Sequence, residues 1–161
     1  MCIRDRPYAD HFGCEFVAGA KHWGATDVDV NMPSAMQNDV RMDSAEKIAA
    51  SGVKYYIEVA NMPTTNDALR YLMDCGLIVA PSKAVNAGGV ATSALEMAQN
   101  SERMVWTAQE VDKQLRQIMN TIYTMSVEAA EEYGLGYNLV AGANIAGFQR
   151  VADAMMAQGV F

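Results

Sequence analysis

Histidine and cysteine are scarce in this 161-residue chain, which holds only His11, His22, Cys2, Cys14 and Cys75. The cysteine spacings match neither a zinc site nor a disulfide framework, and two histidines leave a metal ion short of ligands. We therefore expect no metal site and interpret the histidines as structural. Cysteines without a disulfide pattern favour a reducing, cytoplasmic location.

Long apolar runs and excess positive charge are also missing. No window of about 18 uninterrupted apolar residues occurs, so no membrane span is expected. Twelve Lys and Arg stand against 19 Asp and Glu, giving a net charge of −7. Without a basic stripe we expect no nucleic-acid partner. The chain has 51% hydrophobic residues and no low-complexity tract, which predicts a folded globular protein.

The first residues follow no pattern. Residues 1–6 show no periodicity and lack the apolar segment of a secretory signal, so we interpret them as an extraneous leader. Residues 8–13 are typical of the end of a helix that stops at Gly13. Because the pattern opens on a helix end, we expect that a preceding segment has been lost.

Strands and helices then alternate along the sequence. We expect strands over 14–18, 28–32, 55–60 and 77–80, and helices over 43–50, 64–75, 107–133 and 138–158. Capping pairs support three of the helix starts: Asp43 with Glu46, Thr64 with Asp67, and Thr107 with Glu110. This alternation predicts the α/β class, with a mostly parallel sheet, flanking helices and a long C-terminal helical segment.

Three loops follow directly on predicted strands, at residues 32–38, 61–66 and 81–86. Each contains a proline, a small hydroxyl residue and an amide. Ligands bind at the carboxyl ends of strands in open parallel sheets, so we expect the three loops to border one crevice. Thr64 and Asn66 are interpreted as helix caps, whereas Asn61 and Asn86 precede their helices and are interpreted as ligand contacts.

The stretch from Ala80 to Asn100 combines a short apolar run, a proline, a Gly-Gly pair and a segment able to form a helix. Glycines let the backbone approach a ligand, and a helix start favours negative charge. Asn86 and Ser93 would add an amide and a hydroxyl. A carboxylate or a nucleotide would suit this element, although such a pair is also common in plain turns.

The last predicted helix begins with small residues, including Gly142 and Ala146, that permit close approach of another backbone. Its later part carries an apolar face with Phe148, Val151 and Met155. That face predicts a partner surface.

Three sequence stretches resemble the C-terminal part of hexameric bacterial glutamate dehydrogenases. They are MPSAMQN with NMPTTNDAL, PSKAVNAGGVATSALEMAQNSERMVWT, and YNLVAGANIAGFQRVADAMMAQGV. The resemblance runs from about residue 8 to the end. It implies reversible oxidative deamination of L-glutamate to 2-oxoglutarate and ammonia with NAD or NADP, in a homo-hexamer. It also implies that residues 7–137 are the second half of a Rossmann-like coenzyme domain, and that residues 138–161 form a helix packing on a substrate domain outside the chain.

The resemblance assigns ligand contacts by position. Ser93 and Val90 match contacts to glutamate, Asn61 and Asn86 match contacts to the nicotinamide ribose and carboxamide, and Ala35 and Gln37 match the loop beside the coenzyme.

The chain also departs from the family pattern. It has neither the Gly-Gly-x-Lys-Gly-Gly segment of the catalytic lysine nor a G-x-G-x-x-G motif, so we expect catalytic groups outside it and no activity from the chain alone. The choice between NAD and NADP depends on a residue after that motif and stays open. Met36 stands where many family members have threonine, and Val59, at a strand end, stands where many have glycine.

Two alternatives remain. A related dehydrogenase for branched-chain or aromatic amino acids would share the Asn-Ala-Gly-Gly element, but Ser93 favours a substrate with a second carboxylate. A stand-alone binding or assembly module without catalysis would use the apolar face of the last helix.

Overall fold

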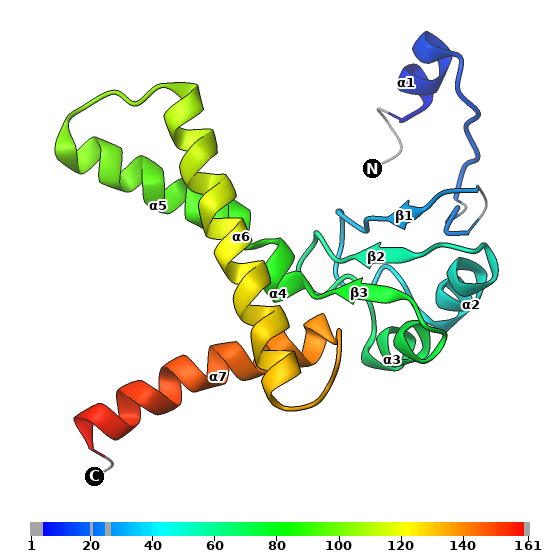
Figure 1. Cartoon of the computed structure of the whole chain (residues 1–161). Coiled ribbons are helices and arrows are strands. Elements are labelled where there is room, and N and C mark those ends of the chain that lie inside the picture. Colours follow the sequence, from blue (N-terminus) through cyan, green and yellow to red (C-terminus); the bar gives the residue numbers. More distant parts are fainter. Residues whose placement is uncertain (1–4, 20, 25–26, 160–161) are drawn as a thin grey trace.

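The computed structural model describes residues 5–19, 21–24 and 27–159 (Figure 1). The elements in chain order are α1 (Asp5–Phe12), β1 (Val30–Asn31), α2 (Met42–Ala50), β2 (Tyr55–Ile57), α3 (Asn66–Asp74), β3 (Ile78–Ala80), α4 (Ser82–Val85), α5 (Ala87–Glu102), α6 (Ala108–Glu132) and α7 (Leu139–Gln158). No helix in these ranges is long and apolar enough to cross a membrane.

The three strands form one parallel sheet in the order β1-β2-β3. Tyr55 pairs with Val30 on one side and with Ile78 on the other. Parallel strands need long crossover connections, and α2 and α3 supply them. The predicted α/β class with a parallel sheet is confirmed.

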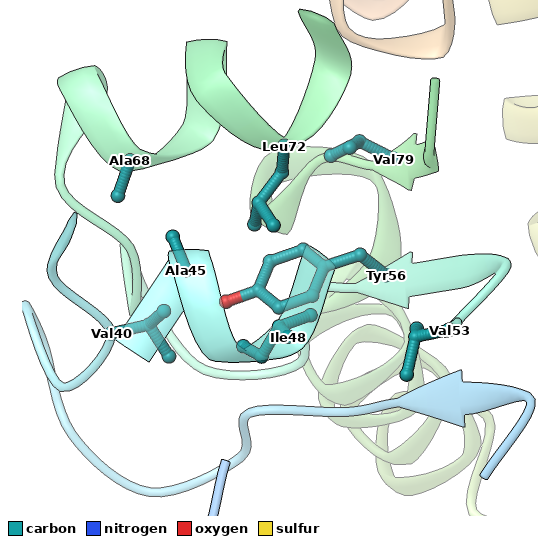
Figure 2. Packing of buried hydrophobic residues seen from close by; sticks show 8 residues of the cluster. All are labelled: Val40, Ala45, Ile48, Val53, Tyr56, Ala68, Leu72 and Val79. Carbon is teal, nitrogen blue, oxygen red and sulfur yellow. The ribbon is translucent and has the colours of Figure 1, made fainter. Parts of the chain in front are cut away.

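The core of this part lies between the sheet and helices α2 and α3 (Figure 2). Tyr56 of β2, Ile48 of α2 and Leu72 of α3 are completely buried and meet there. Five smaller apolar residues complete the buried cluster: Val40, Ala45, Val53, Ala68 and Val79. We call the part from β1 to β3, residues 30–80, the sheet region.

Helices α5, α6 and α7 extend away from the sheet (Figure 1), and we call residues 87–158 the helical arm. Thr107 and Glu110 form the predicted capping box at the start of α6, with the Glu110 N–H donating to the Thr107 hydroxyl over 3.3 Å. Helices α6 and α7 cross closely at Gly142, where an added Cβ would lie 1.8 Å from the Ser126 carbonyl oxygen. The predicted close approach through small residues is confirmed.

The later part of α7 exposes large apolar side chains. Phe148 is 71% exposed, and Val151, Met155 and Met156 are also exposed. The apolar face expected for this helix is therefore present and lies open in the described part of the chain. Along α6, five apolar side chains are only partly buried: Val111, Leu115, Ile118, Met119 and Ile122.

The structure overturns one expectation near the N-terminus and leaves another untested. The strand expected over residues 14–18 is absent, because no neighbouring strand pairs with residues 14–17. Helix α1 begins at Asp5 and so includes two residues assigned to the leader, while residues 1–4 lie outside the described ranges. The leader boundary stays a prediction. Gly13 has a φ of +67° and ends α1 as expected.

The caps expected for α2 and α3 are wrong. Helix α2 begins after Arg41, which leaves Asp43 inside the first turn. Helix α3 begins after Thr65, so Asn66 is its first helical residue. The Thr64 hydroxyl is instead bound to the Tyr56 hydroxyl at 2.7 Å, because a parallel bridge to Val40 draws Thr64 toward the sheet.

Candidate functional site

A cavity of about 470 Å³ lies at the carboxyl ends of the strands, where the three predicted loops meet the start of α5. Its volume falls in the usual range of small-molecule sites. The lining residues are Ser34, Ala35, Gln37, Val59, Ala60, Asn61, Asn86, Gly89, Val90 and Ser93. The structure therefore brings all six predicted site residues to one cavity, as the loop positions indicated.

Backbone hydrogen bonds join the first two loops. The Asn38 N–H donates to the Met62 carbonyl over 3.0 Å, and the Val40 N–H donates to the Pro63 carbonyl over 2.9 Å. The Pro33 carbonyl accepts two further N–H groups, from Ala60 and Val59 just before the second loop, at 2.9 and 3.1 Å. These bonds, together with the prolines, fix the spacing of the two loops.

Strained backbone occurs in both loops. Asn38 has a φ of 54° and Met62 a φ of 46°, in the left-handed region that side chains rarely adopt. Met62 has no side-chain hydrogen bond to favour this conformation, so the cross-loop bonds must hold it. Val59, which replaces a glycine of the family pattern, is not among the positive-φ residues and needs no glycine.

Asn61 and Asn86 contact each other directly. The Asn86 side-chain amide donates to the Asn61 side-chain oxygen. This bond leaves the Asn61 NH₂ group free to donate to a ligand and the Asn86 side-chain oxygen free to accept from one. A ligand carboxamide presents the complementary acceptor and donor.

The Gly-Gly pair lies inside the first turn of α5 and not in a loop before the helix, which corrects the expectation. Asn86 directly precedes the helix but makes no side-chain cap. A Cβ on Gly88 would lie 3.4 Å from Met119 of α6, whereas a Cβ on Gly89 would meet nothing within 4 Å. Gly88 thus allows α5 to pack closely on α6. Gly89 lines the cavity without a side chain that would fill it.

Val90 and Ser93 continue this wall along α5. Val90 is 72% exposed, which leaves its side chain open to a ligand. The Ser93 hydroxyl donates to the Gly89 carbonyl of its own helix over 3.3 Å. That bond is long, so an approaching carboxylate could replace the Gly89 carbonyl as the acceptor of the hydroxyl hydrogen bond.

Two side chains below the cavity were not predicted from the sequence. Tyr56 supports the second loop through its bond to Thr64, and burial raises the pKa of the Tyr56 hydroxyl, which keeps it neutral. Glu58 follows β2 and is buried, with its carboxylate bound to the Ser82 N–H. The sequence indicates neither role, because each depends on a hydrogen-bond partner that only the folded structure brings close.

Metal ligands do not gather anywhere in the part of the chain that the structure describes. Its residues contain no group of three or more His, Cys, Asp or Glu side chains placed to hold an ion. Cys14 and Cys75 are both exposed free thiols. The cavity therefore offers amides, the hydroxyls of Ser34 and Ser93, and backbone groups as its binding chemistry.

Known proteins resemble the chain over most of its length. The family model described as Glutamate/Leucine/Phenylalanine/Valine dehydrogenase matches residues 5–159. The NAD-specific glutamate dehydrogenase of Clostridium symbiosum is 65% identical over 95% of this chain and 34% of its own length. The NADP-specific glutamate dehydrogenase of Escherichia coli (strain K12) is 50% identical over 95% of this chain and 34% of its own length.

A solved glutamate dehydrogenase structure superposes on 96% of the chain and 34% of its own chain, with 64% identity and a TM-score of 0.92. The chain thus spans about a third of the length of these relatives, and its parallel sheet and helices have their Rossmann-like fold. Because the family model matches nearly the whole chain, the chain belongs to the glutamate/leucine/phenylalanine/valine dehydrogenase family.

Proposed function

We propose that the chain forms the nicotinamide-facing and glutamate-facing walls of a glutamate dehydrogenase site. The reaction is the oxidative deamination of L-glutamate to 2-oxoglutarate and ammonia, and its reverse, with NAD or NADP. The observation that carries the proposal is the gathering of all six predicted contact residues around one cavity. The 65% identity to an NAD-specific glutamate dehydrogenase supports it.

The donor set fits a nicotinamide coenzyme. When bound, the coenzyme accepts or returns a hydride at its nicotinamide ring. Asn61 and Asn86 would hold the ribose and the carboxamide, because their mutual bond leaves one donor and one acceptor free. Ala35 and Gln37 would line the loop beside the coenzyme. Holding the ring in one orientation lowers the barrier to transfer.

Ser93 and Val90 would meet the amino-acid substrate on the other side of the cavity. Ser93 would donate to a carboxylate, and Val90 would contact the aliphatic part of the side chain. A hydroxyl placed for a carboxylate gains nothing from an apolar side chain, so Ser93 favours glutamate over leucine. No lysine or aspartate lines this cavity, so the proton-transfer groups would come from outside the chain.

The remaining assignments follow the same proposal. Residues 7–137 would belong to the coenzyme domain, and the exposed apolar face of α7, within residues 138–161, would pack on a substrate domain. The full protein would be a cytoplasmic homo-hexamer. Relatives of both coenzyme types resemble the chain, so NAD and NADP both remain candidates.

A graft tests the proposal. This chain would replace the matching third of the Clostridium symbiosum enzyme, and glutamate-dependent NAD reduction would be measured in the assembled product. We expect activity from the graft and none from the chain alone. A correctly assembled graft without activity would contradict the proposal, and a preference for leucine would point to the related amino-acid dehydrogenases.

Ser93 offers a sharper version of the same test. We expect Ser93→Ala in the graft to raise the KM for glutamate by about tenfold, equal to the loss of one charge-assisted hydrogen bond. Ser101→Ala is the matched control, because Ser101 is also exposed on α5 and its hydroxyl also donates one turn back, to the Met97 carbonyl. The control should leave the glutamate KM unchanged.

A further inference from the structure

Glu58 is a buried carboxylate located between the two loops that carry Asn61 and Asn86. It is 4% exposed and follows directly on β2. Its backbone N–H donates to the Ala80 carbonyl at the end of β3 over 3.0 Å. Its side-chain oxygen accepts the Ser82 N–H, the first of α4, at 3.1 Å. One residue thus ties the end of β2 to the start of the next loop.

These contacts form part of a closed ring. The Asn86 N–H donates to the Ser82 carbonyl over 2.9 Å, which makes α4 a single rigid turn between them. The Asn86 side chain then donates to Asn61, which lies on the loop that begins at Glu58. The ring therefore runs from Glu58 through Ser82 and Asn86 to Asn61 and back along the chain. A change at one link alters the spacing of the two amides.

Stability alone does not account for a carboxylate here. A buried carboxylate carries a desolvation cost, and among the described residues Glu58 takes part in no ion pair. An apolar side chain would avoid that cost but could not accept the Ser82 N–H, which lies at a partly buried position. The side chain that satisfies this donor also sets where α4 begins.

Glu58 does not itself border the ligand cavity. It lines a second cavity of about 550 Å³, which shares Gln37 with the ligand cavity but is bordered by neither Asn61 nor Asn86. The hydrogen bond from the Ser82 N–H is the contact through which the Glu58 side chain acts on α4 and Asn86.

We propose that Glu58 is a positioning residue that sets the spacing of the Asn61 and Asn86 side chains and thereby the orientation of a bound nicotinamide carboxamide. This inference rests on the proposed dehydrogenase function. The Glu58 side chain acts through the hydrogen bond that it accepts from the Ser82 N–H.

The decisive variants alter either end of that link in the graft. Glu58→Ala removes the acceptor, and Ser82→Pro removes the donor while keeping the first helical position that proline tolerates well. We expect each to raise the coenzyme KM about tenfold and to lower kcat by about 10- to 100-fold. The glutamate KM should change less than about twofold, because Ser93 lies outside the ring.

Conservative variants provide the controls. Glu58→Gln keeps an acceptor oxygen, and Ser82→Ala keeps the N–H, so both should stay within about threefold of the parent in coenzyme KM. Glu46→Gln, at an exposed glutamate of α2, should behave as the parent. A Glu58 that only supports the fold would lower kcat through lost folded enzyme and leave both KM values unchanged. That pattern would overturn the inference. So would a Ser82→Pro graft with unchanged coenzyme KM and kcat, or a Glu58→Gln graft as impaired as Glu58→Ala.

A spectroscopic readout separates this inference from the proposed function. In the 161-residue chain labelled with ¹⁵N-asparagine, Glu58→Ala and Ser82→Pro should both shift the side-chain amide resonances of Asn61 and Asn86. Glu58→Gln and Ser82→Ala should leave them in place. If the parent graft lacks activity, the proposed function fails while these resonances still report on the ring. If Ser82→Pro left the Asn61 and Asn86 resonances unmoved, the inference that Glu58 positions these two side chains would be overturned.

Discussion

The sheet region and the helical arm bury apolar surface in opposite ways. In the sheet region, large side chains such as Tyr56, Ile48 and Leu72 close around one core (Figure 2). In the helical arm, the buried residues are mainly small, such as Ala130 and Gly142, while Phe148 and other large side chains lie exposed. The sheet region therefore supplies its own stability, whereas the arm gains little from the burial of large side chains.

The candidate site lies where these two regions meet. The first two loops belong to the sheet region and are fixed by its backbone hydrogen bonds, while Val90 and Ser93 come from α5 of the arm. In the proposed function, the coenzyme contacts Ala35, Gln37 and Asn61 lie in the self-supporting region, and the substrate contacts lie in the more open arm. Asn86 lies between the two regions, at the end of α4. Such a division would allow the substrate side to adjust when further protein packs against the arm.

The largest effect is expected in the core of the sheet region. Leu72 is 0% exposed, so Leu72→Ala should lower the free energy of unfolding by about 3 kcal/mol through lost burial and a remaining cavity. Urea unfolding of the chain measures it. Leu135→Ala, at a leucine that is 46% exposed, is the control and should cost less than about 1 kcal/mol. Equal losses of unfolding free energy at Leu72 and Leu135 would show that the sheet region does not depend on its buried core more than the arm depends on its exposed side chains.

The next effect tests the crossing of α6 and α7 in the arm. Gly142→Ala would place a Cβ against the Ser126 carbonyl oxygen, so we expect a loss of about 2 kcal/mol in unfolding free energy. Gly147→Ala lies on the same helix with nothing within 4 Å of the new Cβ. It should stabilise the chain by about 0.5–1 kcal/mol through higher helix propensity. A harmless Gly142→Ala would mean that the two helices do not cross closely.

The hydrogen bond between Tyr56 and Thr64 sets the third effect. Tyr56→Phe should cost about 1–2 kcal/mol, because the buried Thr64 hydroxyl loses its partner. In a double-mutant cycle with Thr64→Val, the combined loss should be smaller than the sum of the single losses. Additive losses in urea unfolding would show that the two hydroxyls do not interact.

Local patterns in the sequence predicted the sheet and the gathering of the three loops, because strand, turn and helix signals follow the chain order that parallel sheets require. They failed where a distant partner decides the outcome. Residues 14–17 have strand-like composition but no strand beside them, and Thr64 has capping character but binds Tyr56.

The same reason explains the side chains that were missed at the candidate site. Glu58 finds its hydrogen-bond donor 24 residues later, at Ser82, and nothing in either local pattern marks that pairing. The sequence could place Asn61 and Asn86 at the ends of strands, but their direct contact depends on this three-dimensional arrangement.

A smaller effect concerns the strained second loop. Met62→Gly should stabilise the chain by about 0.5–1 kcal/mol, because relief of the left-handed conformation exceeds the entropy that glycine adds to the unfolded state. Met36→Gly is the matched control in the first loop, where the residue is also exposed but has no positive φ, and should be destabilising. Equal effects in thermal unfolding would mean that the loop bonds store no strain.

The smallest effect on the chain itself is expected at the exposed face of α7. Phe148 contributes little burial, so Phe148→Ser should change the free energy of unfolding of the chain by less than about 0.5 kcal/mol. In the graft, the same variant should destabilise the assembled enzyme by about 2–4 kcal/mol if a substrate domain covers this face, since a buried phenylalanine would then be lost. Thermal unfolding of both forms provides the measurement. Arg150→Ser, an exposed position two residues along α7, is the control for helix propensity. A Phe148→Ser graft as stable as its parent would show that the arm remains open, and the difference in burial between the two regions would then belong to the complete protein as well.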